Sequence, residues 1–252
     1  MNFLKLNTSI LGYLVVILSL SIFFISCEKT DDVTDATAIQ AEEGNRSTTN
    51  NAQEISIDEN TEVLKPIMYK SFDGDLSKEE VEVKWKKEVK TFIEKYKLEN
   101  PQIVERGFST ELFFDIYTRT GCQTNNNTDG DAYARFNFRS NNGTRTTSWY
   151  ELDNFGDDRE KCDWDIYLMR RDGLSGEVIT YAEARWAQLA LKGTDGWFPT
   201  DFDIHIHNSD QTVSATGASH IYSAPNTWLD SSSSGAWDYY STGTIGFGRL
   251  SF

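Results

Sequence analysis

The chain has 252 residues and a formal net charge of −15 at pH 7, from 39 acidic and 24 basic side chains. Nucleic-acid binding depends on Lys and Arg side chains that displace the counterions of phosphates, so this charge balance argues against a nucleic-acid partner. The same charge repels anionic lipid unless a cation bridges the two surfaces.

The first 26 residues have the features of a secretion signal. Lys5 provides a short basic start, and the run ILGYLVVILSLSIFFI at 10–25 is nearly all apolar. Cys27 then follows a small residue, which resembles a bacterial lipobox with Phe24 where leucine is usual. An uncleaved anchor is the alternative, but a spanning helix needs about 20 apolar residues. We expect cleavage before Cys27 and lipid attachment to its sulfur.

The segment after the signal is acidic and poor in apolar side chains. Residues 28–63 hold ten acidic and two basic residues among Thr, Asn, Ser and Ala. Such a composition cannot build a core and is typical of a disordered, self-repelling chain. We expect residues 27–63 to be a tether that holds the folded part away from a membrane.

Residues 77–98 have the pattern of an amphipathic helix. Ser77 and Glu80 form a capping box, S-x-x-E, and Leu76 and Val81 occupy the positions of a hydrophobic staple. Apolar residues recur at steps of three and four: Val81, Trp85, Val89, Phe92, Ile93 and Tyr96. The favoured interpretation is that this stripe packs on the following domain. The alternative is a lysine-rich helix that lies on a membrane or binds a partner.

From Ser109 onward the pattern changes to a period of two residues. Apolar residues alternate along four runs, at 112–117, 132–139, 163–168 and 202–207. Clusters of Asn, Gly, Asp and Ser separate these runs. Many half-buried strands with such loops predict an antiparallel β-sandwich.

Two cysteines remain if Cys27 carries lipid. An exported chain lies in an oxidising compartment, where leftover cysteines usually pair. We predict a Cys122–Cys162 disulfide; two free thiols or a metal-binding pair are the alternatives.

Four segments together resemble the PLAT (lipoxygenase homology, LH2) domain family. They read TGCQTNNNTDGDAYARFNFRSNNG, WYELDNFGDD, LKGTDGWFPTDFDIHIHN and NTWLD, in the family's order, over about residues 110–240. The resemblance implies an eight-stranded β-sandwich that binds Ca²⁺ at loops on one end and docks on lipid or on a protein. Asn127 departs from the family's glycine, and Asp157 stands where asparagine is usual. The implied metal ligands are Asp129, Asp131, Asp153, Asn154, Gly156, Asp158 and Asp195.

The chemistry of these loops agrees with calcium. Loops 127–131 and 153–158 supply five aspartates and two asparagines beside glycine. Calcium takes six to eight oxygen ligands from such groups, whereas softer metals prefer Cys and His. The alternative is a pair of polar turns, because Asp, Asn and Gly are common turn residues.

Three aromatic residues flank these loops: Trp149, Trp197 and Phe198. Exposed rings at the metal end would insert into the headgroup region of a membrane. The alternative is that they are core residues.

The run DIHIH places Asp203, His205 and His207 on one face of a strand. Zinc binding is conceivable with a third ligand, but a solvated strand face is the favoured interpretation. No motif for a nucleophile or for phosphate binding is present in the sequence, so we expect no enzymatic activity.

The sequence therefore predicts an exported lipoprotein of the bacterial outer membrane that faces the periplasm or the cell surface. Its expected parts are a signal peptide (1–26), a disordered tether (27–63), a helical segment (64–108) and a PLAT-like β-sandwich (109–252). The expected function is calcium-dependent binding of lipid or of a protein surface. The alternative is a carbohydrate-binding sandwich with structural calcium, in which sugars stack on Trp149, Trp197, Trp228 and Trp237.

Overall fold

The computed structural model describes residue 57 and residues 61–101, 112–153, 159–171, 179–207, 219–244 and 246–251. The expected signal peptide, Cys27 and most of the expected tether lie outside these residues. Glu54–Phe252 form one compact unit. In the part of the chain that is described, no helix has the length and apolar character that crossing a membrane requires.

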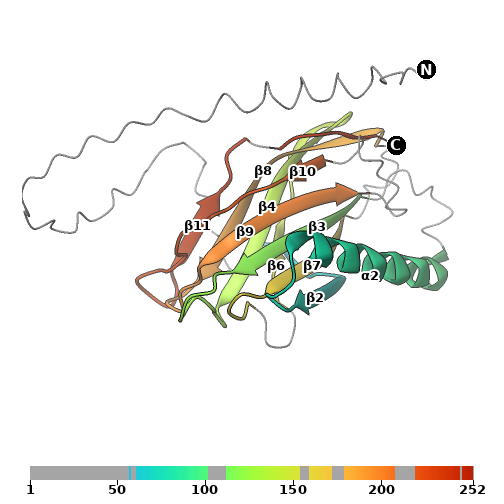
Figure 1. The fold of residues 1–252 in the computed structure, drawn as a ribbon. Helices are drawn as coiled ribbons and strands as arrows, with labels where there is room; N and C mark the ends of the chain where they lie inside the picture. The colour runs from blue at the N-terminus through green and yellow to red at the C-terminus, as the bar shows by residue number, and fades with distance from the viewer. Residues whose placement is uncertain are drawn as a thin grey trace, which may run out of the picture. The chain divides into compact units, whose positions relative to one another are not determined.

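The secondary structure is mostly β, with one long helix among the described residues (Figure 1). In chain order the elements are β1 (Val63–Leu64), β2 (Met68–Phe72), α2 (Lys78–Glu99), β3 (Leu112–Thr120), β4 (Asp131–Ser140), β5 (Gly143–Thr146), β6 (Trp149–Glu151), β7 (Trp164–Arg171), β8 (Tyr181–Lys192), β9 (Pro199–His207), β10 (Ser219–Ile221), β11 (Trp237–Ser241) and β12 (Leu250–Ser251).

The strands form two sheets, which confirms the predicted all-β sandwich. One sheet has the order β1-β6-β4-β8-β11, with β12 also paired to β8 and β5 to β4; the other has the order β10-β9-β3-β7-β2. Every pair is antiparallel except β1 with β6, which is parallel.

The strand count exceeds the expected eight. The described residues hold a seven-stranded and a five-stranded sheet. The additional strands are the short β5 and β12, and β1 and β2, which precede the expected start of the sandwich. The pairing of β2 with β7 and of β1 with β6 makes residues 63–72 part of both sheets.

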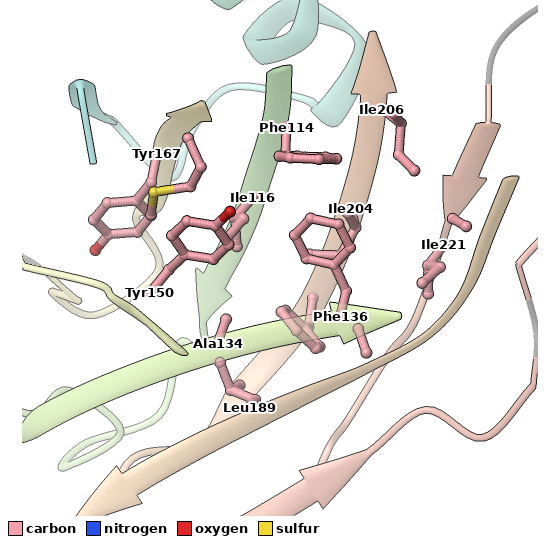
Figure 2. Packing of buried hydrophobic residues seen from close by; sticks show 14 of the residues in the cluster. Phe114, Ile116, Ala134, Phe136, Tyr150, Tyr167, Leu189, Ile204, Ile206 and Ile221 are labelled. Carbon is pink, nitrogen blue, oxygen red and sulfur yellow. The ribbon is translucent and has the colours of Figure 1, made fainter. Parts of the chain in front are cut away.

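The main core lies between the two sheets. Side chains from both inner faces meet there, including Phe114 and Ile204 from one sheet and Phe136 and Leu189 from the other (Figure 2). Phe114 and Phe136 have ring centroids 4.4 Å apart. Burial of these large apolar groups is the dominant force that holds the sheets together.

Helix α2 begins and ends as its sequence predicts. Ser77 is the N-cap, and the reciprocal bonds of the capping box with Glu80 are both present. The apolar stripe packs on the outer face of the five-stranded sheet, where Trp85 and Val89 are fully buried. The favoured interpretation of the stripe is therefore correct, and the helix does not present it to a membrane in this structure.

The helix changes the burial of the sheet beneath it. Strand β3 is buried on both faces: Phe114 and Ile116 point into the main core, while Phe113 and Tyr117 join the cluster under α2. When a sheet is covered on both sides, the residues of a strand that point to either face are buried, including polar ones.

Candidate functional site

Described residues of several connecting segments gather at one end of the sandwich, which we name the loop end: residues 121–130, 152–153, 159–163, 193–198 and 222–236. The strand register brings them together. Asp131 at the start of β4 pairs with Lys192 at the end of β8, and Tyr133 pairs with Glu151 at the end of β6. Thr120 at the end of β3 pairs with Pro199 at the start of β9.

A cleft at the loop end unites two of the predicted metal ligands. It has a volume of about 620 Å³ and is lined by Asn125, Asn127, Asp129, Asp195, Gly196, Trp228 and Asp230. Asp129 and Asp195 were expected from the sequence. Asp230 was not selected, although it ends the NTWLD segment that carries the family resemblance.

Hydrogen bonds fix Asp195 against the turn that carries Asp129. The Asp195 Oδ2 atom accepts from the Asp129 backbone N–H at 2.7 Å and from the Thr128 hydroxyl at 2.9 Å. Thr128 in turn accepts from the Gly130 N–H at 2.9 Å. The two loops are thus held in a fixed relation before any ligand binds.

Asp131 and Asp153 lie on a neighbouring part of the loop end. The Leu152 N–H donates to Ala132 at 2.8 Å, so the register places Asp153 beside Asp131. Burial, together with the nearby Asp131, Glu151 and Asp153, raises the pKa of Tyr133 to about 12. Asp153 also lines a separate small cavity of about 70 Å³ with Lys65, Pro66, Tyr69 and Glu151.

The remaining predicted ligands, Asn154, Gly156 and Asp158, lie outside the described residues. Among the residues that are described, no three His, Cys, Asp or Glu side chains are grouped as a metal site. The donor types in the cleft nevertheless fit a hard cation, because they are carboxylate and amide oxygens without sulfur or imidazole. Asp129, Asp195 and Asp230 are the charged residues that line the cleft.

Sequence reasoning missed a buried cation at this end. Arg159 is 3% exposed, and its guanidinium donates to the carbonyl oxygens of Gly130, at 3.0 Å, and of Leu152. The backbone N–H of Arg159 donates to the Asp165 carboxylate at 2.9 Å. Arg159 therefore ties the 127–131 turn to the start of the 153–158 loop. The sequence signal was an arginine that directly follows Asp157 and Asp158.

Two of the three aromatic contact residues are not at the surface. Trp149 is 2% exposed and Trp197 is fully buried, with its Nε1–H donating to Thr120 at 2.9 Å. Neither can insert into a membrane, and neither can stack on a sugar at the tip, because each side chain fills a packed cluster. Phe198 is half-buried beside Trp228, with ring centroids 5.4 Å apart. Trp228 is 46% exposed and lines the cleft.

The sequence favoured a solvated face for the DIHIH strand, and this prediction is wrong, because the face is buried. Asp203, His205 and His207 are 0%, 5% and 6% exposed, because side chains of neighbouring elements pack on this side of β9. The rings of His220 and Tyr222 lie against His205, and the Phe113 ring stacks on His207. Lys78 of α2 forms an ion pair with Asp203, and His207 Nε2 lies 3.2 Å from Asp115 Oδ1.

Burial sets the protonation of this cluster. It lowers the pKa of His205 well below its usual value, and the nearby His220 and Lys78 lower it further. Burial also lowers the pKa of His220 to about 4 and raises the pKa of Asp203 to about 6. The imidazoles of His205 and His220 are therefore neutral at pH 7.

The predicted disulfide is present. Cys122, just after β3, is bonded to Cys162, just before β7, with Cα atoms 4.5 Å apart. The Arg119 guanidinium donates to the carbonyl oxygens of Cys162, at 3.3 Å, and of Gly74, at 3.1 Å. These contacts fasten the chain before α2 to the disulfide.

Comparison with known proteins gives structural likeness only. No protein-family model and no curated protein matches this chain. Solved structures that match include a LOX deletion variant, the alpha-toxin of Clostridium perfringens and coral 8R-lipoxygenase, each at 16% identity with a TM-score of 0.34. They cover 54%, 54% and 53% of this chain, which spans 16%, 33% and 17% of theirs. The sandwich itself is established by its sheet topology.

Proposed function

We propose that the chain is a non-catalytic module that binds calcium in the loop-end cleft and docks there on membrane lipid. The observation that carries the proposal is that Asp129, Asp195 and Asp230, from three separate loops, line one cleft together with Trp228. Three carboxylates in a chain of net charge −15 repel an anionic headgroup. Bound calcium would reverse that local charge and bridge the carboxylates to lipid phosphate.

The aromatic side chains beside the cleft support a membrane partner. Trp228 is exposed, and Phe198 packs against it edge to face. Tryptophan at a membrane interface buries an apolar ring while its N–H stays near polar headgroups. Calcium and Trp228 would then act together, one on the phosphate and the other on the headgroup boundary. A protein surface is the second class of partner, and the test below separates the two.

The module would reach its membrane through a lipid anchor. We propose that Cys27 is acylated and that the protein is an outer-membrane lipoprotein. Residues around the anchor lie outside the described part, so the proposal rests on the sequence pattern. The protein should partition into the detergent phase of a phase-separation assay, and C27S should move it to the aqueous phase. Equal partitioning of both forms would contradict the anchor.

Calcium binding is tested by calorimetry on D195N and on a matched control. Asp195 loses its charge in D195N, whereas E94Q removes one exposed charge from α2, away from the cleft. We expect calcium to release or absorb heat and to raise the Tm of the wild type and of E94Q. D195N should bind calcium about 10-fold or more weakly, since a charged ligand oxygen is lost. No heat and no Tm shift in the wild type would overturn the proposed site.

Membrane docking is tested by pelleting with vesicles of phosphatidylserine and phosphatidylcholine. The wild type should pellet with calcium and stay in solution with a chelator. W228A should bind calcium as the wild type does but pellet less, because it removes only the exposed ring that would enter the headgroup region. Calcium binding without any pelleting would favour a protein partner instead of lipid.

A further inference from the structure

The outer face of the seven-stranded sheet holds a buried cation without a counterion. Arg135 of β4 is 7% exposed. Its Nε–H donates to the Gln188 side chain at 2.7 Å, and no ion pair to Arg135 occurs within the described residues. Burial lowers the pKa of its guanidinium, and the nearby Tyr239 phenol partly offsets this effect. A buried charge is normally paired, because desolvation costs free energy that only a partner offsets.

Aromatic rings hold this guanidinium in place. Its Cζ atom lies 4.5 Å from the ring centroid of Trp149 and 5.9 Å from that of Trp186. Cation–π contact of this kind stabilises the charge and orients the planar fork. The Nη atoms make no hydrogen bond within the part of the chain that is described, so their donors remain available for a planar oxyanion.

The surrounding face combines rings with amide and hydroxyl groups. The register sets Arg135 opposite Gln188, and Gln188 opposite Ser241, in one row across three strands. Half-buried Tyr133, Trp237 and Tyr239 lie on the same face, with Tyr133 and Trp237 centroids 5.1 Å apart. Ile57 of the same chain packs against Trp149 and Ala190 and covers that part of the face.

We propose that this face binds a saccharide that carries a carboxylate, with the carboxylate on Arg135 and the sugar ring on the neighbouring aromatic side chains. A pyranose ring has an apolar C–H face for the rings and hydroxyls for Gln188 and Ser241. A peptide is less well matched, because backbone groups in the interior of a sheet are already paired and cannot add a strand. The site shares no residue with the calcium cleft and does not depend on the proposed function.

Calorimetry at pH 7 in a chelator tests the proposal, because the chelator removes calcium bridging. The probes are oligogalacturonate and oligoglucuronate, with neutral oligomers of the same ring size for comparison. We expect the wild type to bind at least one uronate oligomer and neither neutral one. R135Q and R135K should bind about 10-fold or more weakly, because Lys keeps the charge but loses the bidentate fork. R139Q, an exposed arginine on the same strand, should bind as the wild type does.

Each other outcome would overturn the site. These are equal binding by R135K, equal binding of a neutral oligomer, no binding of either uronate, or Arg135-dependent binding of an acidic peptide in place of the saccharide. Circular dichroism and Tm establish that each variant is folded. If R135Q does not fold, R135K decides the question, since it retains the charge and the aliphatic stem.

Discussion

At the residue scale, the loop end contains a positive charge of its own. The carboxylates of loops 127–131 and 153–158 repel one another, and we expected a divalent cation to hold them together. Arg159 already supplies part of that force, since its guanidinium binds the carbonyl oxygens of Gly130 and Leu152 from within. A preformed loop end lowers the ordering cost of binding calcium.

Replacing this arginine should destabilise the protein. In R159M, two loop carbonyls lose a charged donor and become unsatisfied in a buried setting. The expected loss in the free energy of unfolding is about 2–4 kcal/mol. Urea denaturation measures it, and R139Q is the matched control, with an expected change within about 0.5 kcal/mol because Arg139 is exposed. Equal losses in the two variants would show that the Arg159 contacts do not stabilise the loops.

At the element scale, α2 was predicted almost completely because its signals are local. The capping box, the staple and the apolar stripe all lie within about two dozen residues, and each acts on neighbouring turns. The four strands predicted by alternation were found for the same reason. What the sequence could not show is which faces the helix covers, because that depends on partners far along the chain.

Strand β9 illustrates the difference. Its alternation of Ile with His and Asp is typical of a strand with one solvated face. In the structure, Asp203 is fully buried with Lys78 of α2 as its partner, and the rings of His220 and Tyr222 pack on His205. Polar residues can occupy a buried face when a neighbouring element satisfies them, so periodicity alone misassigned their exposure.

Burial of these groups predicts that acid weakens the fold. The unfolded chain protonates His205 and His220 near pH 6.5, whereas the folded chain resists protonation of both. Their contribution to stability is complete above about pH 6.5 and is lost as the pH falls toward 4. Asp203 has the opposite effect: it adds stability as the pH falls from about 6 to 3.8, because the folded chain holds the Asp203 proton more tightly than the unfolded chain does. Two imidazoles outweigh one carboxyl, so the net effect is destabilisation by acid.

Urea denaturation at pH 7 and pH 5 tests this prediction. The wild-type midpoint should be lower at pH 5, and H205Q should show a smaller difference because a non-titrating side chain replaces the most buried imidazole. Each variant's own pH 7 midpoint is the control for its overall stability. The charged groups that face this cluster are Lys78, Glu82 and Lys86 from α2, Asp115 from β3, and Asp201 and Asp203 from β9. An unchanged pH difference in H205Q would contradict the assignment.

At the scale of the whole molecule, the sandwich class followed from the sequence but its assembly did not. Strands β1 and β2 pair with β6 and β7, about 85 to 100 positions later, and no local pattern marks such short strands. The same limit affects the loop end. Asp129 and Asp195, which the sequence predicted as ligands of one metal ion, line the same cleft. Trp149 and Trp197 were expected at the surface, but packing by distant strands buries them.

The disulfide acts on the whole molecule through the unfolded chain. It closes a loop with a sequence separation of 40 and joins the ends of β3 and β7, which are neighbours in one sheet. The chain-entropy relation gives a stabilisation of about 4 kcal/mol for a loop of this size. That is a large part of the typical net stability of a domain, roughly 5–15 kcal/mol.

Removing the disulfide should therefore lower stability without changing the fold. In the double variant C122A/C162A, the free energy of unfolding should fall by about 3–4 kcal/mol, chiefly because the unfolded chain gains conformational freedom. Urea denaturation of the wild type and of the double variant, both without reductant, measures the difference. Reduction of the wild type should reproduce it, while the double variant should not respond to reductant. The circular dichroism spectrum should stay the same, since the hydrogen bonds of Arg119 to Gly74 and to the backbone of residue 162 need no thiol. Equal midpoints for the wild type and the double variant would mean that the reduced ends of β3 and β7 are already held together in the unfolded ensemble.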